Sequence, residues 1–99
     1  MQSKNYKEML MELYEELLKA ETEKEIEEFL QDLCTIKELE SMSQRLKAAK
    51  MLLQGKTYNE IVEETEISSA TLARVSKCVR YGNGGYKSLI EKEKKEKAQ

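Results

Sequence analysis

Three Thr-x-x-Glu segments most constrain the fold of this chain, because each is typical of the start of a helix. They lie at residues 22–25, 35–38 and 57–60. In such a capping box the Thr hydroxyl accepts a hydrogen bond from a backbone N–H of the first turn, and the Glu carboxylate accepts one from the N–H of the Thr. The 99 residues contain no proline, few aromatic side chains and no long alternating segment that would suit a strand. The sequence therefore predicts an all-α fold.

Apolar residues at helical spacing place the first three helices. The first helix carries its apolar residues between Tyr6 and Leu18, and the second carries them between Ile26 and Leu33. In the third helix they continue toward Gly55, which can take the left-handed conformation that ends a helix. The apolar series of this third helix is Ile36, Leu39, Met42, Leu46, Ala49 and Leu53.

Two short helices are predicted next, and together they carry a helix-turn-helix motif at Tyr58 to Lys77. In a helix-turn-helix, apolar residues at set offsets fix the angle between two such helices, and the second helix lies in the major groove of DNA. Ser68 is placed to cap a recognition helix from about Ser69 to Arg80, with aliphatic residues on either side of it acting as a hydrophobic staple. The four aliphatic residues at these offsets are Ile61, Ile67, Leu72 and Val75.

The outward positions of this pair suit contact with a nucleic acid. Small side chains at the start of the recognition helix let its N-terminus approach the bases, and later cations can reach phosphates. Glu66 and Val62 occupy two positions where the motif more often has Gly and a small residue. A plain αα-hairpin would show the same apolar spacing and use Ser68 only as a cap. The outward residues are Ser68, Ser69, Ala70, Thr71, Arg74 and Lys77.

The net charge of −2 hides an uneven distribution along the chain. Residues 1–40 hold five Lys and twelve Asp or Glu, whereas residues 41–99 hold twelve Lys or Arg and seven Glu. Between Ile67 and Ile90 there is no carboxylate, so this window can approach a polyanion without like-charge repulsion. We predict phosphate contacts there. Its cations are Arg74, Lys77, Arg80 and Lys87.

The chain has room for one small domain. A domain of this size buries only about two thirds of its unfolded surface, so we expect a second copy to complete the core. We predict a single helical domain over residues 1–90, with the helix-turn-helix at residues 58–77. The charged segment 91–99 is predicted to be a frayed tail.

No residue pattern points to catalysis, a metal or a cofactor. The chain has no His, and Cys34 and Cys78 form neither a CxxC motif nor a paired framework, so both are predicted to be buried and reduced. No nucleophile is paired with a base, and we predict no enzyme activity. No apolar run approaches the length of a membrane span, which predicts a cytoplasmic protein without a membrane partner.

Residues 35–86 resemble the Trp repressor superfamily, most closely its Trp-repressor-like YerC/YecD branch. The most specific segments are LLQG before the helix-turn-helix, ATLAR at residues 70–74 and the glycine-rich YGNGGY at residues 81–86. The resemblance implies a bacterial, intertwined homodimer whose N-terminal helices interlock and leave two helix-turn-helix heads at opposite ends. The positions that face bases in the family match Asn59, Ser69, Ala70 and Thr71.

A second group of family positions concerns a small ligand. Thr35, Arg45 and Arg74 match the polar positions that hold the tryptophan corepressor in the repressor itself. Val75 falls where the repressor keeps a glycine, and a valine side chain would intrude beneath the indole ring. We therefore do not expect tryptophan as a ligand, although another effector stays open. Arg45 and Arg74 are interpreted as a phosphate contact and as members of intersubunit ion pairs.

The predicted function is that of a sequence-specific transcription regulator that binds double-stranded DNA as a homodimer. The alternative is a helical adaptor that contacts another protein of the transcription machinery without touching DNA, which the acidic first forty residues favour. RNA binding is disfavoured because the sequence offers no cluster of aromatics for base stacking. The YGNGGY segment lacks the context of a phosphate-binding loop and is interpreted as a flexible turn.

Overall fold

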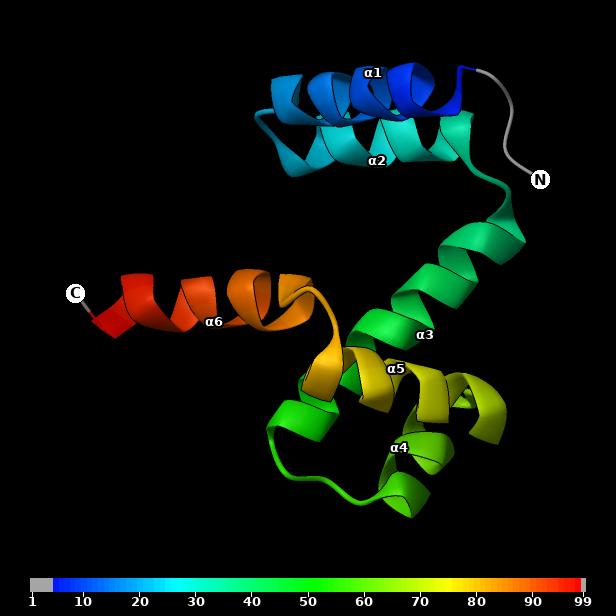
Figure 1. Cartoon of the computed structure of the whole chain (residues 1–99), viewed down its shortest axis with the longest axis vertical. Coiled ribbons are helices and arrows are strands. Elements are labelled where there is room, and N and C mark those ends of the chain that lie inside the picture. The colour runs from blue at the N-terminus through cyan, green and yellow to red at the C-terminus, as the bar shows by residue number, and fades with distance from the viewer. Residues whose placement is uncertain (1–4, 99) are drawn as a thin grey trace. The chain divides into compact units, whose positions relative to one another are not determined.

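Six α-helices and no strand make up residues 5–98, the part of the chain that this computed structural model describes (Figure 1). Side chains are described for residues 5–92. None of the helices in this part is long and apolar enough to cross a membrane. The all-α prediction is confirmed. The helices are α1 (Tyr6–Lys19), α2 (Glu23–Leu33), α3 (Ile36–Leu53), α4 (Tyr58–Thr65), α5 (Ser69–Tyr81) and α6 (Gly85–Ala98).

Each of the three Thr-x-x-Glu segments forms the capping box that the sequence predicts. At the start of α2, the backbone N–H of Glu25 donates to Oγ1 of Thr22 at 3.1 Å, and the N–H of Thr22 donates to Oε1 of Glu25 at 3.2 Å. The same pair of bonds forms in the segments 35–38 and 57–60. The boxes fix where α2, α3 and α4 begin, because they pair backbone donors that a helix start leaves without partners.

Gly55 ends α3 in the way that the sequence predicts. Its φ angle is +81°, in the left-handed region that favours glycine. The backbone N–H of Gly55 donates to the carbonyl of Leu52 at 3.0 Å, and the N–H of Lys56 donates to that of Met51 at 3.0 Å. These two bonds make a Schellman motif, which closes the helix end and turns the chain toward α4.

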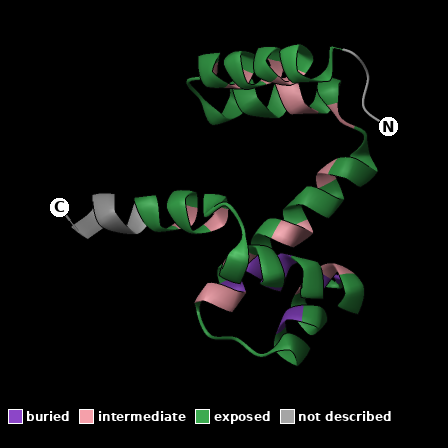
Figure 2. Cartoon of the chain, viewed as in Figure 1, coloured by how far each residue is buried: buried purple, intermediate pink, exposed green. Residues whose placement is uncertain are grey.

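The chain packs as two compact units, residues 1–39 and 40–99, whose boundary falls inside α3. The first unit contains α1 and α2, and neither helix has a buried residue (Figure 2). The second unit has a hydrophobic core to which α3, α4 and α5 contribute. The predicted single domain over residues 1–90 stays a prediction. The core residues are Ala48, Ala49, Met51, Ile61, Ile67, Leu72 and Val75.

The apolar series predicted for α3 is not the side of the helix that this core buries. Of its six members, only Ala49 is buried, and the core takes Ala48 and Met51 from the same helix instead. Met42 and Leu46 are 42% and 44% exposed. One chain by itself therefore leaves an apolar stripe of α3 uncovered.

The two C-terminal helices end at Tyr81 and at Ala98. The first of these ends agrees with the predicted end of the recognition helix at about Arg80, and the fraying expected of residues 91–99 stays a prediction. The segment 91–98 consists of Glu, Lys and Ala, which are good helix formers, and it has no glycine or proline to stop a helix.

The glycine-rich segment makes the turn between α5 and α6 that its composition predicts. The backbone N–H of Gly82 donates to the carbonyl of Cys78 at 2.9 Å, and a Cβ at Gly82 would collide with that carbonyl. Gly84 has a φ angle of +85°. The path of the chain thus requires glycine at two of these positions.

The two cysteines are free thiols, but the prediction that they are buried was wrong. Cys34 is half-buried and Cys78 is exposed. The buried residues of α5 are Leu72, Val75 and Ser76, and Cys78 does not belong to that buried side. No three His, Cys, Asp or Glu side chains gather into a metal site anywhere in the described part of the chain.

Candidate nucleic-acid interface

Four aliphatic side chains hold α4 and α5 together at the positions that the sequence identified. Ile61 of α4, Ile67 of the connecting turn, and Leu72 and Val75 of α5 are all buried in one core. α5 packs against both α4 and α6 (Figure 1). Because close-packed interiors leave little free volume, this clamp fixes which side of α5 faces outward.

The turn between the two helices is closed by local hydrogen bonds. The hydroxyl of Thr65 donates to the carbonyl of Ile61 at 2.7 Å and accepts the backbone N–H of Ile67 at 3.2 Å. Glu66 has a φ angle of +62°, and its N–H donates to the carbonyl of Val62 at 2.9 Å. Glu66 occupies the motif position that more often has glycine, and its backbone is left-handed. A residue with a Cβ adopts this conformation at a cost in conformational energy.

Ser68 caps α5 as the sequence predicts. Its Oγ accepts the backbone N–H of Thr71 at 3.1 Å and donates to Oγ1 of Thr71 at 2.8 Å. Ile67 and Leu72, on either side of the cap, are both buried in the core, which is the arrangement of a hydrophobic staple. The N-terminal tip of α5 is therefore held by two hydroxyl groups and by the core beneath it.

The outward surface of α4 and α5 carries the residues that sequence reasoning assigned to DNA contact. Thr71 is half-buried, and the other six are exposed. The structure brings Ser68 and Thr71 into direct contact and places Ser69 and Ala70 beside them at the start of α5. The exposed six are Asn59, Ser68, Ser69, Ala70, Arg74 and Lys77.

Two further residues of α5 share this exposed surface: Arg80, which belongs to the predicted cationic window, and Ala73, which the sequence did not single out. Ala73 lies three residues after Ala70, and Arg80 lies three residues after Lys77, so each lies on the same side of the helix as its predecessor. Both are exposed. Helical spacing was the signal that could have found Ala73, whose side chain has no polar group to suggest a role.

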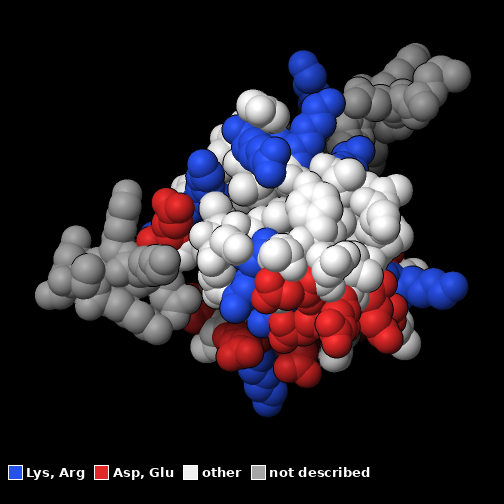
Figure 3. Space-filling view, turned by 90° about the horizontal axis from the view of Figure 1, so that it is seen from below, with Lys and Arg blue, Asp and Glu red and all other residues white. Residues whose placement is uncertain are grey.

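The two helices of the pair carry opposite charges. No ion pair joins the carboxylates of α4 and the turn to the cations of α5 within the described residues. Figure 3 shows a group of acidic side chains in the lower part of the face seen from below, with several basic side chains beside it and others toward the top. The α5 cations thus remain available to a polyanion, while the carboxylates disfavour its approach along α4. The exposed charges are Glu60, Glu63, Glu64 and Glu66 on α4 and the turn, and Arg74, Lys77 and Arg80 on α5.

The carboxyl group of Glu60 serves the start of α4. The backbone N–H of Thr57, and then its hydroxyl, donate to the carboxylate and lower the pKa of Glu60. The same causes lower the pKa of Glu38, which Thr35 pairs with at the start of α3. Both carboxyl groups therefore stabilise the N-terminus of a helix. In α4 this N-terminus also carries Asn59, the predicted base contact.

The three residues that match corepressor-binding positions have different surroundings. Thr35 lies in the first unit, where its hydroxyl accepts the N–H of Glu38 at 3.1 Å. Arg45 is half-buried, and its Nε has no hydrogen-bond partner within the described residues. Arg74 is exposed on α5. Next to it, Val75 is only 2% exposed and belongs to the core.

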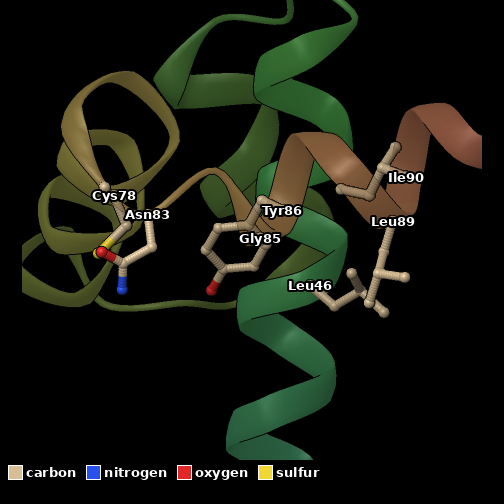
Figure 4. Close-up of a pocket in the computed structure, with 8 residues that line it drawn as sticks. Leu46, Cys78, Asn83, Gly85, Tyr86, Leu89 and Ile90 are labelled. Carbon is tan, nitrogen blue, oxygen red and sulfur yellow. The ribbon is translucent and has the colours of Figure 1, made fainter.

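An apolar pocket of about 480 Å³ lies between α3, the end of α5 and α6 (Figure 4). Leu46 of α3 and Leu89 of α6 both line it, together with Cys78, Tyr86 and Ile90. Leu89 is 72% exposed. The second unit therefore has an uncovered apolar surface next to the helix pair, and it continues the exposed stripe of α3.

Comparison with known proteins agrees with this architecture. A family sequence model described as Trp repressor protein matches residues 8–94. The uncharacterized protein YerC of Bacillus subtilis is 41% identical over 85 residues, which span 86% of this chain and 82% of YerC.

Two solved structures are also similar. The crystal structure of a candidate Trp repressor from Staphylococcus aureus has a TM-score of 0.85 and 36% identity, over 94% of this chain and 96% of that one. A TrpR-like protein from Eubacterium eligens has a TM-score of 0.83 and 39% identity, over 86% of this chain and 88% of that one. The match covers most of the chain and confirms the resemblance of residues 35–86: this all-α chain is a Trp-repressor-like protein of the Trp repressor family, similar to YerC.

Proposed function

We propose that this protein is a cytoplasmic, sequence-specific DNA-binding transcription regulator that acts as a homodimer and carries out no catalysis. The observation that carries the proposal is the buried clamp of Ile61, Ile67, Leu72 and Val75, which presents an outward surface of α5 without any carboxylate. Membership of the Trp repressor family supports it. In such a head, α5 would enter the major groove by its N-terminal tip.

The chemistry along α5 fits this role. Its first turn has short side chains, at Ser69 and Ala70, that let the backbone come close to base edges. Its later turns carry Arg74, Lys77 and Arg80, which can reach the phosphates on either side of a groove. Asn59 at the start of α4 would contribute a further base contact.

A second copy of this chain is the proposed cover for the exposed apolar surfaces. The first unit has no buried residue among those described, and helices of this length are marginal without packing. Leu18 and Ile36 are 84% and 83% exposed, and the second unit leaves Leu46 and Leu89 open around its pocket. Large uncovered apolar surfaces mark interaction sites, and two copies of the same chain would supply such surfaces to each other.

In the proposed regulator, tryptophan is not required to position the two helix-turn-helix heads. Val75 contributes a buried side chain to the core beneath α5, where the indole ring of tryptophan would need free space. Arg45 and Arg74 are then free to act on phosphates or across the dimer, as proposed from the sequence. An effector other than tryptophan is compatible with the unpartnered Nε of Arg45.

Selection of binding sites from random duplex DNA by the purified full-length protein tests the proposal. We expect a symmetric motif with half-sites about 34 Å apart, because two recognition helices enter successive major grooves. Arg74→Ala and Lys77→Ala should weaken binding to all sequences and lower the slope of log affinity against log salt by about one each. Changes at Ser69 or Thr71 should instead alter the preferred sequence.

Lys24→Ala is the matched control, since Lys24 is an exposed cation on α2 of the first unit. We expect this variant to bind DNA like the wild type. Equal binding by the wild type and Arg74→Ala would contradict the proposed interface. A dimer that enriches no symmetric motif, even at low ionic strength, would favour the adaptor alternative, which the acidic residues 1–40 support.

Light scattering on the purified protein tests the dimer. The double variant Leu46→Glu/Leu89→Glu places charge in the apolar pocket and should shift the mass from dimer toward monomer. Ser88→Glu adds one such charge at an exposed neighbouring position of α6 and should remain dimeric. A monomeric wild type would refute the homodimer and leave DNA binding to be judged by the selection experiment.

A further inference from the structure

We propose that α5 recognises thymine methyl groups in the major groove of its DNA half-site, through the methyl side chains of Ala70 and Ala73. The inference rests on the proposed DNA binding and adds the base chemistry that the head reads. Two observations support it: hydroxyl groups at the tip of α5 bond to each other, and α5 has no Asn, Gln, Asp or Glu side chain.

Much of the hydrogen-bonding capacity at the tip is already used inside the protein. Ser68 spends its only hydroxyl hydrogen on Oγ1 of Thr71, at 2.8 Å, and accepts the backbone N–H of Thr71 at 3.1 Å. Thr71 is half-buried in this arrangement. Ser69 keeps an exposed hydroxyl, but a hydroxyl can bond several base edges and selects poorly among them.

The side chains that read adenine and cytosine are missing from α5. Asn and Gln bond adenine in the major groove, and Asp and Glu accept from cytosine. None of these four residue types occurs between Ser69 and Tyr81. Specific hydrogen bonding from α5 is thus left to its cations, which suit guanine or phosphate.

Near the tip, the outward surface offers methyl groups instead. Ala70 and Ala73 are both exposed and lie three residues apart on one side of α5, ahead of Lys77. Thymine is the base that presents a methyl group in the major groove. Packing of an alanine methyl group against a thymine methyl group removes apolar surface from water. A thymine facing Ala70 or Ala73 would therefore be favoured over a cytosine at the same place.

The test replaces single thymines by deoxyuridine in the duplex that the wild-type dimer enriches, which removes the 5-methyl group and leaves base pairing intact. Fluorescence anisotropy then gives the ratio of dissociation constants for the two duplexes. At one or two positions in each half-site we expect binding to weaken about fourfold, as for the loss of one buried methyl group. Replacement of thymines outside the protected region should leave binding unchanged.

Protein variants identify the reader. Ala70→Gly and Ala73→Gly should each bring the thymine-to-deoxyuridine ratio at one position close to one, because the partner methyl group is then absent. The ratio is measured on one protein preparation, so any loss of folded protein cancels. Lys77→Ala is the control: it should weaken binding to both duplexes and keep the ratio.

Three results would overturn the proposal. If the wild type binds its selected duplex and no deoxyuridine in either half-site changes the affinity, methyl reading is refuted while DNA binding stands. If the ratio survives in both glycine variants, another group reads the methyl. If no duplex is bound at low ionic strength, the proposed function fails and this inference fails with it.

Discussion

The side-chain amide of Gln44 donates a hydrogen bond of 3.1 Å to the backbone carbonyl of Thr65, the last residue of α4. Carbonyls at the end of a helix have no partner within the helix, and this one is partly buried. The bond ties α3 to the point where the chain turns from α4 toward α5. It is a long-range link in the head, separate from the aliphatic clamp.

Loss of this bond should destabilise the protein. We expect Gln44→Ala to lower the free energy of unfolding by about 1–2 kcal/mol, because it leaves the Thr65 carbonyl unpaired. Gln44→Glu has a similar shape but cannot donate when ionised, so it should be less stable than Gln44→Ala near neutral pH. Urea denaturation of the variants measures both effects. Gln54→Ala, a change to an exposed glutamine, should stay within about 0.5 kcal/mol of the wild type.

Glu66 should be improvable, since it is a non-glycine residue with a φ angle of +62°. Glu66→Gly relieves the left-handed strain and should raise the free energy of unfolding by about 0.5–1 kcal/mol, net of the greater freedom of glycine in the unfolded chain. Glu63→Gly removes the same charge from the interior of α4 and should lower stability by about 1 kcal/mol. Equal losses for both variants in thermal denaturation would contradict this account of the turn.

Gly82 and Gly85 should respond to alanine in opposite directions. A Cβ at Gly82 would collide with the carbonyl oxygen of Cys78, whereas a Cβ at Gly85 meets no atom within 4 Å. Gly82→Ala should therefore cost about 1 kcal/mol or more, and Gly85→Ala, at the first residue of α6, should gain about 0.4–1 kcal/mol. Chemical denaturation of the pair measures the difference, and a stabilising Gly82→Ala would show that the turn can take another path.

The capping box of α4 should make stability depend on pH. The pKa of Glu60 is lowered by the N–H and hydroxyl of Thr57 in the folded protein, so its contribution is fully present above the ordinary value of 4.5. That contribution is lost as the pH falls through the lowered pKa. Glu60→Gln should therefore reduce the loss of stability between about pH 5 and pH 3, as followed by urea denaturation at each pH. A Glu60→Gln profile as steep as that of the wild type would contradict this role of the capping box.

Tryptophan should affect neither stability nor DNA affinity. A ligand present at 100 times its dissociation constant stabilises a protein by about 2.7 kcal/mol, which a thermal shift detects easily. We expect no shift for the wild type, because Val75 is buried in the core beneath α5. Val75→Gly is the informative comparison: it should lower stability by about 2–4 kcal/mol and is the variant in which a tryptophan-dependent shift becomes possible. A clear shift of the wild type would show that the valine leaves room after all.

Several features of the fold and of the candidate site follow from residues close together in the sequence. The capping boxes at residues 22–25, 35–38 and 57–60, the end of α3 at Gly55 and the Ser68 cap all depend on hydrogen bonds between neighbours in the chain. The aliphatic clamp was also predictable, because its spacing is characteristic of one motif. Hydrogen bonds between chain neighbours and the spacing of the aliphatic residues do not depend on how distant parts of the chain pack.

The sequence by itself determined where α2, α3, α4 and α5 start and which residues join α4 to α5, but only the tertiary structure decided which side of a helix is covered. On α3 the core chose Ala48 and Met51 and left Met42 and Leu46 outside, and on α5 it left Cys78 exposed. It also left Ala70 and Ala73 on the outward surface. Burial depends on which other helix packs against a given side, and a pattern of apolar residues states only that some partner is needed.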